Sequence, residues 1–316
     1  MRKKPLLIII VGPTASGKSD AALRLAKKIN GEIISADSRQ IYRGLNIGTA
    51  KIKGVWKRNT FIAGGIPHFC IDTADPRHGV TAVEFKQRAQ QAIADIHDRS
   101  KIPILVGGTG FWIDAVVYDM DFPHVAPNKA LRLRLEKKTI PELLAMLKKC
   151  DARRAALIEQ KNPRRLIRAI EIAHALGSVP ATVEKRHPYR TLWIGLCPDQ
   201  ETLKKRIITR SAAMITGGLV RETKRIIAKK ISKKRIKEFG FEYTAALHFI
   251  EKKINRPELE RVLVRDTVAY ARRQMRWFKK NQDIRWVTTT RQAEQLATRF
   301  IFKKPQRIPV NAGKMK

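Results

Sequence analysis

The chain has 316 residues, of which 43% are hydrophobic, so it can form one large domain or two around a substantial core. Lysine and arginine outnumber aspartate and glutamate by 65 to 28, and this net charge of +37 favours a polyanionic partner, nucleic acid before an anionic membrane surface. No apolar run approaches the ~20 residues of a membrane span, and three scattered cysteines without zinc-binding spacing predict reduced thiols in a cytoplasmic protein.

The first predicted elements are a strand, a glycine-rich loop and a helix. Residues 6–11 form an unbroken apolar run rich in β-branched side chains, which is typical of a strand buried on both faces. Between residues 21 and 29, apolar side chains recur at helical spacing. The loop between them fits the pattern G-x-x-x-x-G-K-[ST] and consists of Gly12, Pro13, Thr14, Ala15, Ser16, Gly17, Lys18 and Ser19.

This context predicts a phosphate-binding loop rather than a glycine-rich turn that binds nothing. Backbone N–H groups and the helix N-terminus would face the anion. Lys18 would add a positive charge, and Ser19 would supply a hydroxyl ligand for Mg²⁺. The pattern identifies neither the phosphate compound nor the atom that is attacked.

A carboxylate follows the second predicted strand, residues 32–36. That strand ends in the sequence Asp37-Ser38-Arg39-Gln40. Ligands gather outside the carboxyl ends of the strands of an open parallel sheet, so we expect Asp37 on the same rim as the phosphate loop. Three roles stay open for it from position alone: general base, magnesium ligand or turn-former.

Between residues 44 and 110 the sequence predicts one further strand, which ends in a glycine turn. Residues 44–67 are expected to be loop-like and irregular, and His68, considered alone, is more often structural than catalytic. Residues 83–96 predict a helix, and residues 101–106 a buried strand that ends in Gly107-Gly108-Thr109-Gly110. A motor or helicase would place a Walker-B aspartate after such a strand, so the glycines count against that class.

Basic amphipathic helices replace the strand-like runs between residues 119 and 188. Pro163 suits the first position of one helix, on which Arg164, Arg165 and Arg168 lie three and four residues apart. Such a cluster is usually a solvated face, although it also fits a nucleic-acid contact. We interpret this block as a helical insertion in the α/β domain.

Strand character returns at residues 191–196, and further helices follow. A helix at residues 201–214 is expected to turn four basic side chains outward, namely Lys204, Lys205, Arg206 and Arg210. A long helix from about residue 258 to residue 280 carries Arg272 and Arg273 beside aromatic residues. Arginines beside aromatics fit both an RNA-stacking surface and an ordinary amphipathic helix end, so this pattern decides nothing alone.

These elements together predict an α/β fold, a P-loop NTPase-like parallel sheet flanked by helices, with an all-helical insertion domain. The predicted bounds are residues 1–118 and 189–302 for the catalytic core, 119–188 for the insertion, and 303–316 for a basic, disordered tail.

Seven motifs in order resemble those of the bacterial type of tRNA dimethylallyltransferase, from residue 6 to about residue 287. The resemblance is carried by Gly12–Ser19; Asp37–Gly44 with Ile47–Lys51; Pro67-His68; Gly107–Gly110; Asn162 with Arg164-Arg165 and Arg168-Ala169; Met214 with Gly218-Leu219; and Tyr270–Gln274 with Trp277-Phe278.

The resemblance implies transfer of a dimethylallyl group from dimethylallyl diphosphate to N6 of adenosine 37, next to the tRNA anticodon. It implies that residues 12–19 hold the diphosphate with Mg²⁺ at Ser19, and that Asp37 and Thr109 are catalytic. The net charge, which a generally basic host proteome would also explain, then has the anticodon stem-loop as partner. The implied tRNA-binding residues are Asp37, Ser38, Arg39, Gln40, Thr109, Arg132, Arg164, Arg165, Leu166, Ile167, Arg168, Arg272 and Arg273.

Four positions depart from the family pattern: Phe69, Trp112, Phe241 and Arg276. None removes a group assigned to chemistry, but Trp112 and Phe241 leave the prenyl pocket undefined. We expect a monomer that binds no membrane. Two other functions stay open, a small-molecule or nucleotide kinase with the same loop, and a nucleotide-gated RNA-binding protein that makes no product.

Overall fold

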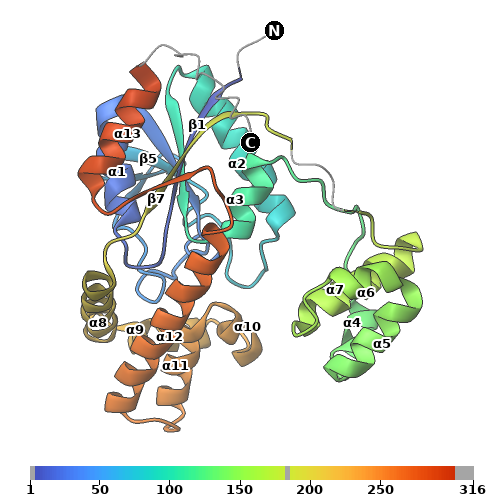
Figure 1. Ribbon diagram of the computed structural model, residues 1–316. Helices are drawn as coiled ribbons and strands as arrows, with labels where there is room; N and C mark the ends of the chain where they lie inside the picture. Colours follow the sequence, from blue (N-terminus) through green and yellow to red (C-terminus); the bar gives the residue numbers. More distant parts are fainter. Residues whose placement is uncertain (1–3, 182–185, 303–316) are drawn as a thin grey trace, which may run out of the picture. The chain divides into compact units, whose positions relative to one another are not determined.

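The computed structural model describes residues 4–181 and 186–302, so the tail expected at residues 303–316 lies outside the described residues. The chain divides into two compact units. Unit 1 comprises Met1–Asp119 and His187–Lys316, and unit 2 comprises Met120–Arg186 (Figure 1). Within the described residues, no helix has both the length and the apolar content of a membrane span.

Unit 1 is built on one eight-stranded sheet in the order β3-β4-β5-β2-β6-β1-β7-β8. Neighbours from β5 to β8 are parallel, and β3 and β4 add an antiparallel edge. The predicted α/β class with a central, mainly parallel sheet is thereby confirmed. The strands are β1 (Leu6–Val11), β2 (Gly31–Ala36), β3 (Val55–Lys57), β4 (Thr60–Ala63), β5 (Ile66–Phe69), β6 (Ile102–Gly107), β7 (Arg190–Leu196) and β8 (Ile284–Val287).

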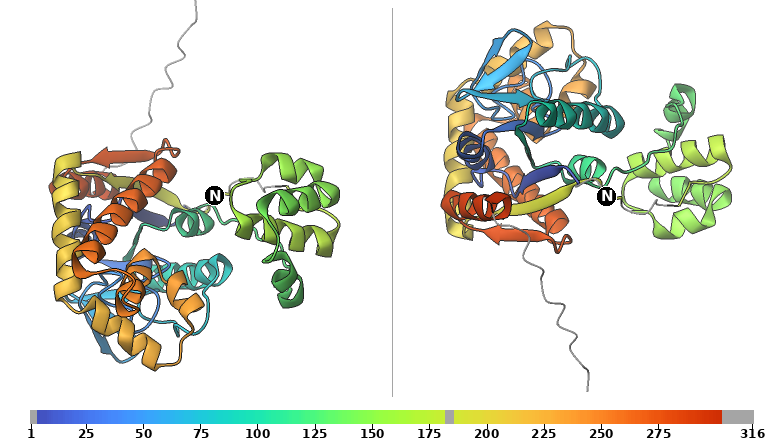
Figure 2. Two further views of the ribbon diagram at one scale, coloured as in Figure 1. Left: turned by 90° about the horizontal axis from the view of Figure 1, so that it is seen from below. Right: turned by 90° about the horizontal axis from the view of Figure 1, so that it is seen from above.

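Helices cover both faces of the sheet (Figures 1 and 2). On one face, α1 (Lys18–Ile29) and α13 (Thr290–Phe302) pack on β1, β2, β6 and β7 in a shared apolar core. On the other face lie α2 (Ala82–Asp98) and α3 (Gly110–Val117). The start of α2 is fixed by a capping box in which Thr81 accepts from the Glu84 N–H group and Glu84 accepts from that of Thr81.

Five more helices complete unit 1: α8 (Gln200–Thr216), α9 (Leu219–Ala228), α10 (Lys233–Glu238), α11 (Phe241–Ile250) and α12 (Arg256–Phe278). Unit 2 contains α4 (Lys129–Leu135), α5 (Ile140–Cys150), α6 (Ala152–Leu157) and α7 (Pro163–Leu176). Its own core includes Leu143, Leu147, Leu166 and Ile170. Apolar residues at three- and four-residue spacing account for this packing, because they form one face of each helix.

The expectation of an irregular segment up to residue 67 is wrong. Residues 55–69 form the three short strands β3, β4 and β5. In β4 the side chains of Phe61 and Ala63 are buried while their neighbours are only partly covered. Such brief alternation gives a weak signal in a basic sequence. Strand β8 and helix α13 were also not anticipated.

Parallel register brings three loops to one rim of the sheet. Ala36, the last residue of β2, pairs with Gly107 of β6, and Ile10 of β1 pairs with Val106. The loops that begin at Gly12, Asp37 and Gly108 therefore start from neighbouring strand ends, where an open parallel sheet places its ligands.

Candidate active site

The Gly12–Ser19 loop connects β1 to α1 in a conformation that requires glycine. Gly12 and Gly17 have φ angles of 143° and 92°, and a Cβ atom at Gly12 would lie 2.2 Å from the carbonyl oxygen of Leu196. Within the described part of the chain, the buried Ser16 hydroxyl has no hydrogen-bond partner. The loop therefore offers an unpaired hydroxyl beside the N-terminus of α1, which suits an anion.

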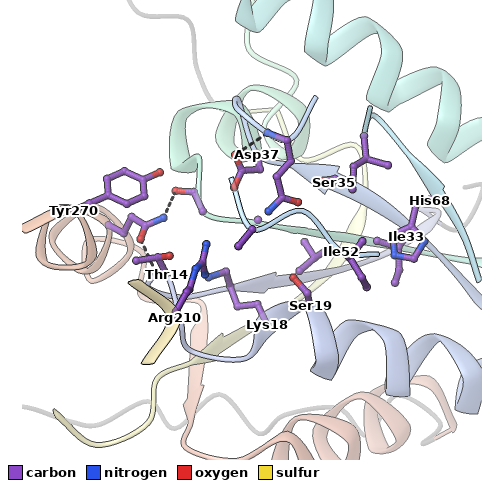
Figure 3. Close-up of a pocket in the computed structure, with 17 residues that line it drawn as sticks. Thr14, Lys18, Ser19, Ile33, Ser35, Asp37, Ile52, His68, Arg210 and Tyr270 are labelled. Atoms are coloured by element: carbon purple, nitrogen blue, oxygen red, sulfur yellow. Dashed lines mark hydrogen bonds between the residues drawn. The ribbon is translucent and has the colours of Figure 1, made fainter. Parts of the chain in front are cut away.

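Lys18 lies in the same loop and lines a pocket at the rim of the sheet (Figure 3). Its Nζ atom donates to the carbonyl oxygen of Pro13 at 2.6 Å. Burial, and then the nearby positive charge of Arg210, lower the pKa of Lys18 to about 7. An anion bound here would relieve this repulsion and restore the proton.

Of the basic residues on α8 expected to face outward, Arg206 is exposed as expected, whereas Arg210 is partly buried and faces the pocket. Arg210 lines the pocket with Lys18, and Arg206 donates to the Ser16 carbonyl oxygen at 3.1 Å. Burial lowers the pKa of Arg210. The expectation for Arg210 failed because helical periodicity identifies a polar face of α8. It does not show whether a polar loop from another element covers that face.

Asp37 lines this pocket as well. Its Oδ1 atom accepts from the backbone N–H groups of Arg39 at 2.9 Å and Gln40 at 3.3 Å, so the turn-forming role is confirmed. The position of the carboxylate in a pocket shared with Lys18 also permits the roles of general base and metal ligand. Those two roles stay predictions.

Thr109 joins the loop after β6 to the loop after β2. Its hydroxyl oxygen accepts from the Ser38 N–H group at 3.0 Å and lies 3.3 Å from the Ser38 hydroxyl. Its own N–H group donates to the Ala36 carbonyl oxygen at 3.2 Å. Thr109 thus fixes the residue next to Asp37, which gives it a positioning role in the structure, and its predicted catalytic role stays a prediction.

Gln274 on α12 was quoted in the sequence motifs but not assigned to the site, and the structure places it at the centre. Its Oε1 atom accepts from the Thr14 N–H group at 2.7 Å, and its Nε2 atom donates to the Gly108 carbonyl oxygen at 3.0 Å. A Cβ atom at Gly108 would lie 2.1 Å from that Nε2 atom. Gln274 lies on the same buried face of α12 as Leu263, Ala271 and Phe278. A glutamine on this otherwise apolar face was the sequence signal that could have identified it.

Arg39 lies next to the pocket residue Tyr270. Its guanidinium pairs with Glu242 at 2.8 Å and lies 4.8 Å from the ring centroid of Tyr270 and 5.2 Å from that of Phe241. Tyr270 and Gln40 both line the pocket. The side-chain amide of Gln40 also donates a hydrogen bond to the Thr49 carbonyl oxygen. The predicted contact of Arg39 with RNA stays a prediction.

Apolar side chains form the other end of the pocket: Ile33, Ile52, Ile71 and Val106. His68 lies among them on β5, with its Nδ1 atom 2.8 Å from the Ile66 carbonyl oxygen. The substituted Trp112 is not part of this lining, because it stacks on Phe85 with ring centroids 4.3 Å apart. The Trp112 substitution therefore leaves the lining of this pocket unchanged.

A buried carboxylate holds the loop at residues 44–51, which carries the pocket residue Ala50. Glu222 accepts from the N–H groups of Asn46, Ile47 and Gly48 at 2.9–3.1 Å and from the Tyr243 hydroxyl at 2.7 Å. Replacing Glu222 by glutamine would turn an NH₂ group toward these donors.

We therefore expect Glu222→Gln to lower the free energy of unfolding by about 1–3 kcal/mol, because buried N–H groups lose their acceptor. Urea unfolding followed by circular dichroism would measure it. Glu260→Gln, at an exposed position on α12, is the matched control and should change little. Equal stability of both variants would contradict this account of the loop.

Apart from Arg39, the arginines expected to bind tRNA divide into two groups: exposed ones, and ones that pair with a buried glutamate. Arg272 and Arg273 are exposed on α12, and Arg164 and Arg165 are exposed on α7, where Arg165 pairs with Glu159 at 2.8 Å. In unit 2, Glu171 accepts twice from Arg132, at 2.7 Å each, and once from Arg168. Burial opposes ionisation of Glu171, but these hydrogen bonds keep its pKa below the usual value.

Leu166 and Ile167 require a correction. Both side chains are buried in the core of unit 2, with exposed fractions of 0% and 7%. They stabilise the helical unit and do not present a surface to RNA, because the apolar face of α7 packs against α5.

The donor set around Ser19 fits a magnesium ion that arrives with a phosphate. Ser19 lines the pocket and is exposed, and Asp37 lies in the same pocket. Within residues 4–181 and 186–302, no group of three or more histidine, cysteine, aspartate or glutamate side chains could hold a metal ion alone. Mg²⁺ commonly binds through one or two protein oxygens, substrate phosphates and water, so a dedicated cage is not needed.

Comparisons with known proteins extend over nearly the whole chain. Residues 40–281 match the family model described as IPP transferase, and residues 5–55 match that described as isopentenyl transferase. The chain is 38% identical over 291 residues to the tRNA dimethylallyltransferase of Alkaliphilus oremlandii, covering 90% of this chain and 91% of that one. It is 39% identical over 289 residues to that of Halothermothrix orenii, covering 89% and 86%. The solved full-length tRNA isopentenylpyrophosphate transferase of Bacillus halodurans superposes with a TM-score of 0.69 at 32% identity, covering 94% of this chain and 96% of that one.

Proposed function

The chain belongs to the IPP transferase family and transfers a dimethylallyl group to tRNA, and from this premise we propose that the donor is dimethylallyl diphosphate and the acceptor N6 of adenosine 37. One observation supports the proposal most directly. Lys18, which suits a diphosphate, and Asp37, which suits an amine proton, line one pocket (Figure 3).

In the proposed reaction the adenine N6 atom attacks C1 of the dimethylallyl group. The N6–C1 bond forms, the bond from C1 to the diphosphate oxygen breaks, and its electron pair leaves with the diphosphate. Asp37 accepts the N6 proton, which matters because the amine lone pair is delocalised into the ring. Lys18, Arg210 and the loop N–H groups stabilise the charge that develops on the diphosphate.

Ser19 would hold Mg²⁺ with the diphosphate, where the ion would neutralise part of the leaving group's charge. The protein's own cations act on the same oxygens. Arg210 matters because it reaches this pocket from α8, outside the phosphate loop, and its guanidinium also donates to the Thr49 carbonyl oxygen at 3.5 Å.

Strong positive charge matches the proposed anticodon stem-loop substrate. The target base must leave its stack to enter a pocket, and a single-stranded loop lowers the cost of that extrusion. Tyr270 lines the pocket, and its ring together with the Arg39 guanidinium that lies over it offers a surface on which a base could stack. We propose a cytoplasmic monomer with free Cys70, Cys150 and Cys197.

The decisive experiment incubates the protein with unmodified tRNA, dimethylallyl diphosphate and Mg²⁺. Nuclease digestion and mass spectrometry should then find dimethylallyl adenosine. Sequencing of the fragments should place the dimethylallyl group at position 37. ATP hydrolysis without prenylation would support the kinase hypothesis, which the family relationship disfavours. Tight tRNA binding without product would support the nucleotide-gated RNA-binding protein.

The arginines at the start of α7 should make phosphate contacts. We expect the double variant Arg164→Ala with Arg165→Ala to weaken tRNA binding and to reduce the slope of log K against log salt by about 2, one for each lost contact. Arg168 is left in place because it supports the buried Glu171. Filter binding at several salt concentrations would measure the slope, with Lys148→Ala and Lys149→Ala on α5 as control. An unchanged slope would refute the phosphate role.

A further inference from the structure

Two polar side chains lie at the apolar end of the pocket. Ile33 and Ser35 are two residues apart on β2, so their side chains lie on the same face of the sheet. The register pairs Ile33 with His68 of β5. Ser35 and His68 are 5% and 6% exposed, and both line the pocket. Figure 3 shows His68 beside Ile33, at the end away from Tyr270.

The hydrogen bond of His68 fixes the state of its ring. A carbonyl oxygen only accepts, so the Nδ1 atom that lies 2.8 Å from the Ile66 carbonyl oxygen carries the proton. Burial lowers the pKa of His68 and so favours the neutral ring. The Nε2 atom is then a hydrogen-bond acceptor.

Both polar atoms lack partners in the protein. In the part of the chain that the structure describes, neither His68 Nε2 nor Ser35 Oγ has a protein hydrogen-bond partner, and neither is sealed from the pocket. Their neighbours in the lining are Ile33, Ile52 and Val106. A purely apolar group that filled this end would leave these two atoms unpaired, at a cost in free energy that a hydroxyl group on the ligand would remove.

The donor's tail must point toward this end. The diphosphate lies at Lys18 and the amine at Asp37, and C1 must reach both. The remaining direction from C1 leads to the apolar side chains around His68, because Tyr270 lies at the opposite end of the pocket (Figure 3). The two terminal methyl groups of a dimethylallyl chain would therefore approach Ser35 and His68.

We propose that this enzyme also uses a five-carbon allylic diphosphate that carries a hydroxyl on a terminal methyl group. The hydroxyl donates to His68 Nε2 and accepts from the Ser35 hydroxyl, so both polar atoms are paired. The reaction is unchanged: N6–C1 forms, C1–O breaks, Asp37 takes the proton, and the distal hydroxyl takes no part, so no oxidant is needed. This inference rests on the proposed donor and acceptor.

The test is a competition between dimethylallyl diphosphate and its terminally hydroxylated analogue at equal concentrations, with unmodified tRNA. Mass spectrometry of the digested tRNA separates the products, which differ by one oxygen atom. We expect wild type to make both, and His68→Leu to lower the ratio of hydroxylated to dimethylallyl product by about tenfold or more, through loss of the acceptor. Ser35→Ala should shift the ratio the same way, whereas Ile71→Val, which changes only the apolar wall, should not.

The two products separate the possible failures. Transfer of neither group by wild type would refute the proposed function itself. Dimethylallyl transfer with no hydroxylated product, or a product ratio that is equal in wild type, His68→Leu and Ser35→Ala, would overturn this inference alone. Dimethylallyl turnover in each variant shows that the protein is folded, so a loss confined to the hydroxylated donor supports the inference.

Discussion

Replacing Asp37 by asparagine should lower the rate of dimethylallyl transfer by about 10²–10⁴-fold, the usual contribution of a positioned general base. Affinity for tRNA should stay near the wild-type value, because the amide has the same size and only the proton acceptor is lost. Single-turnover assays with saturating tRNA and donor would measure the rate, and filter binding would measure the affinity.

Asparagine is the sharper substitution because Asp37 also forms a turn. The side-chain oxygen of asparagine can still accept from the N–H groups of Arg39 and Gln40, whereas alanine would remove both hydrogen bonds. Asp199→Asn is the matched control, since Asp199 caps α8 through the Thr202 N–H group and does not line the pocket. Equal loss of rate and of tRNA affinity in Asp37→Asn would mean that Asp37 is only structural.

Replacing Lys18 by methionine should reduce kcat/KM for the donor by about 10²–10³-fold, comparable to the loss of one preorganised group that stabilises charge in a transition state. Methionine preserves much of the length of the side chain and removes only the ammonium. The expected defect concerns the diphosphate, so tRNA affinity should change little. Lys27→Met, at an exposed position in the last turn of α1, is the control.

Proton uptake gives a second test of Lys18. Its pKa of about 7 lies below the ordinary lysine value because burial and Arg210 disfavour the charged form. A bound diphosphate should raise this pKa, so binding above pH 7 takes up a proton and the affinity falls as the pH rises. Calorimetry with inorganic diphosphate in buffers of different ionisation enthalpy counts the protons. The titration of the diphosphate is common to both proteins, so wild type and Lys18→Met should differ; equal counts would refute the assignment.

Local chemistry was enough to predict the main elements of the sheet and the loop at its rim. The apolar runs that became β1, β2, β6 and β7 are short and contain β-branched residues, and this combination favours strands over helices. Residues 12–19 combine a glycine pattern with a preceding strand and a following helix, so their place at a strand end followed directly. Asp37 followed from the same rule, since parallel strands end on one rim.

Long-range contacts decided what local chemistry left open. Gln274 is 260 residues from Thr14, yet its side chain holds the Thr14 and Gly108 loops together. Arg210 was expected to be solvated, because a helix shows its period but not the loop that another element places beside it. Leu166 illustrates the reverse case, in which a position inside a motif proved to belong to the core.

The sequence by itself determined that this protein has a phosphate loop, a carboxylate on the same rim and a large positive charge, because each depends on neighbouring residues or on composition. Only the tertiary structure decided which side chains complete the pocket and that both Ser35 and His68 line it. The physical reason is that strand register and helix packing set distances between residues that are far apart in the chain, and no local pattern encodes those distances.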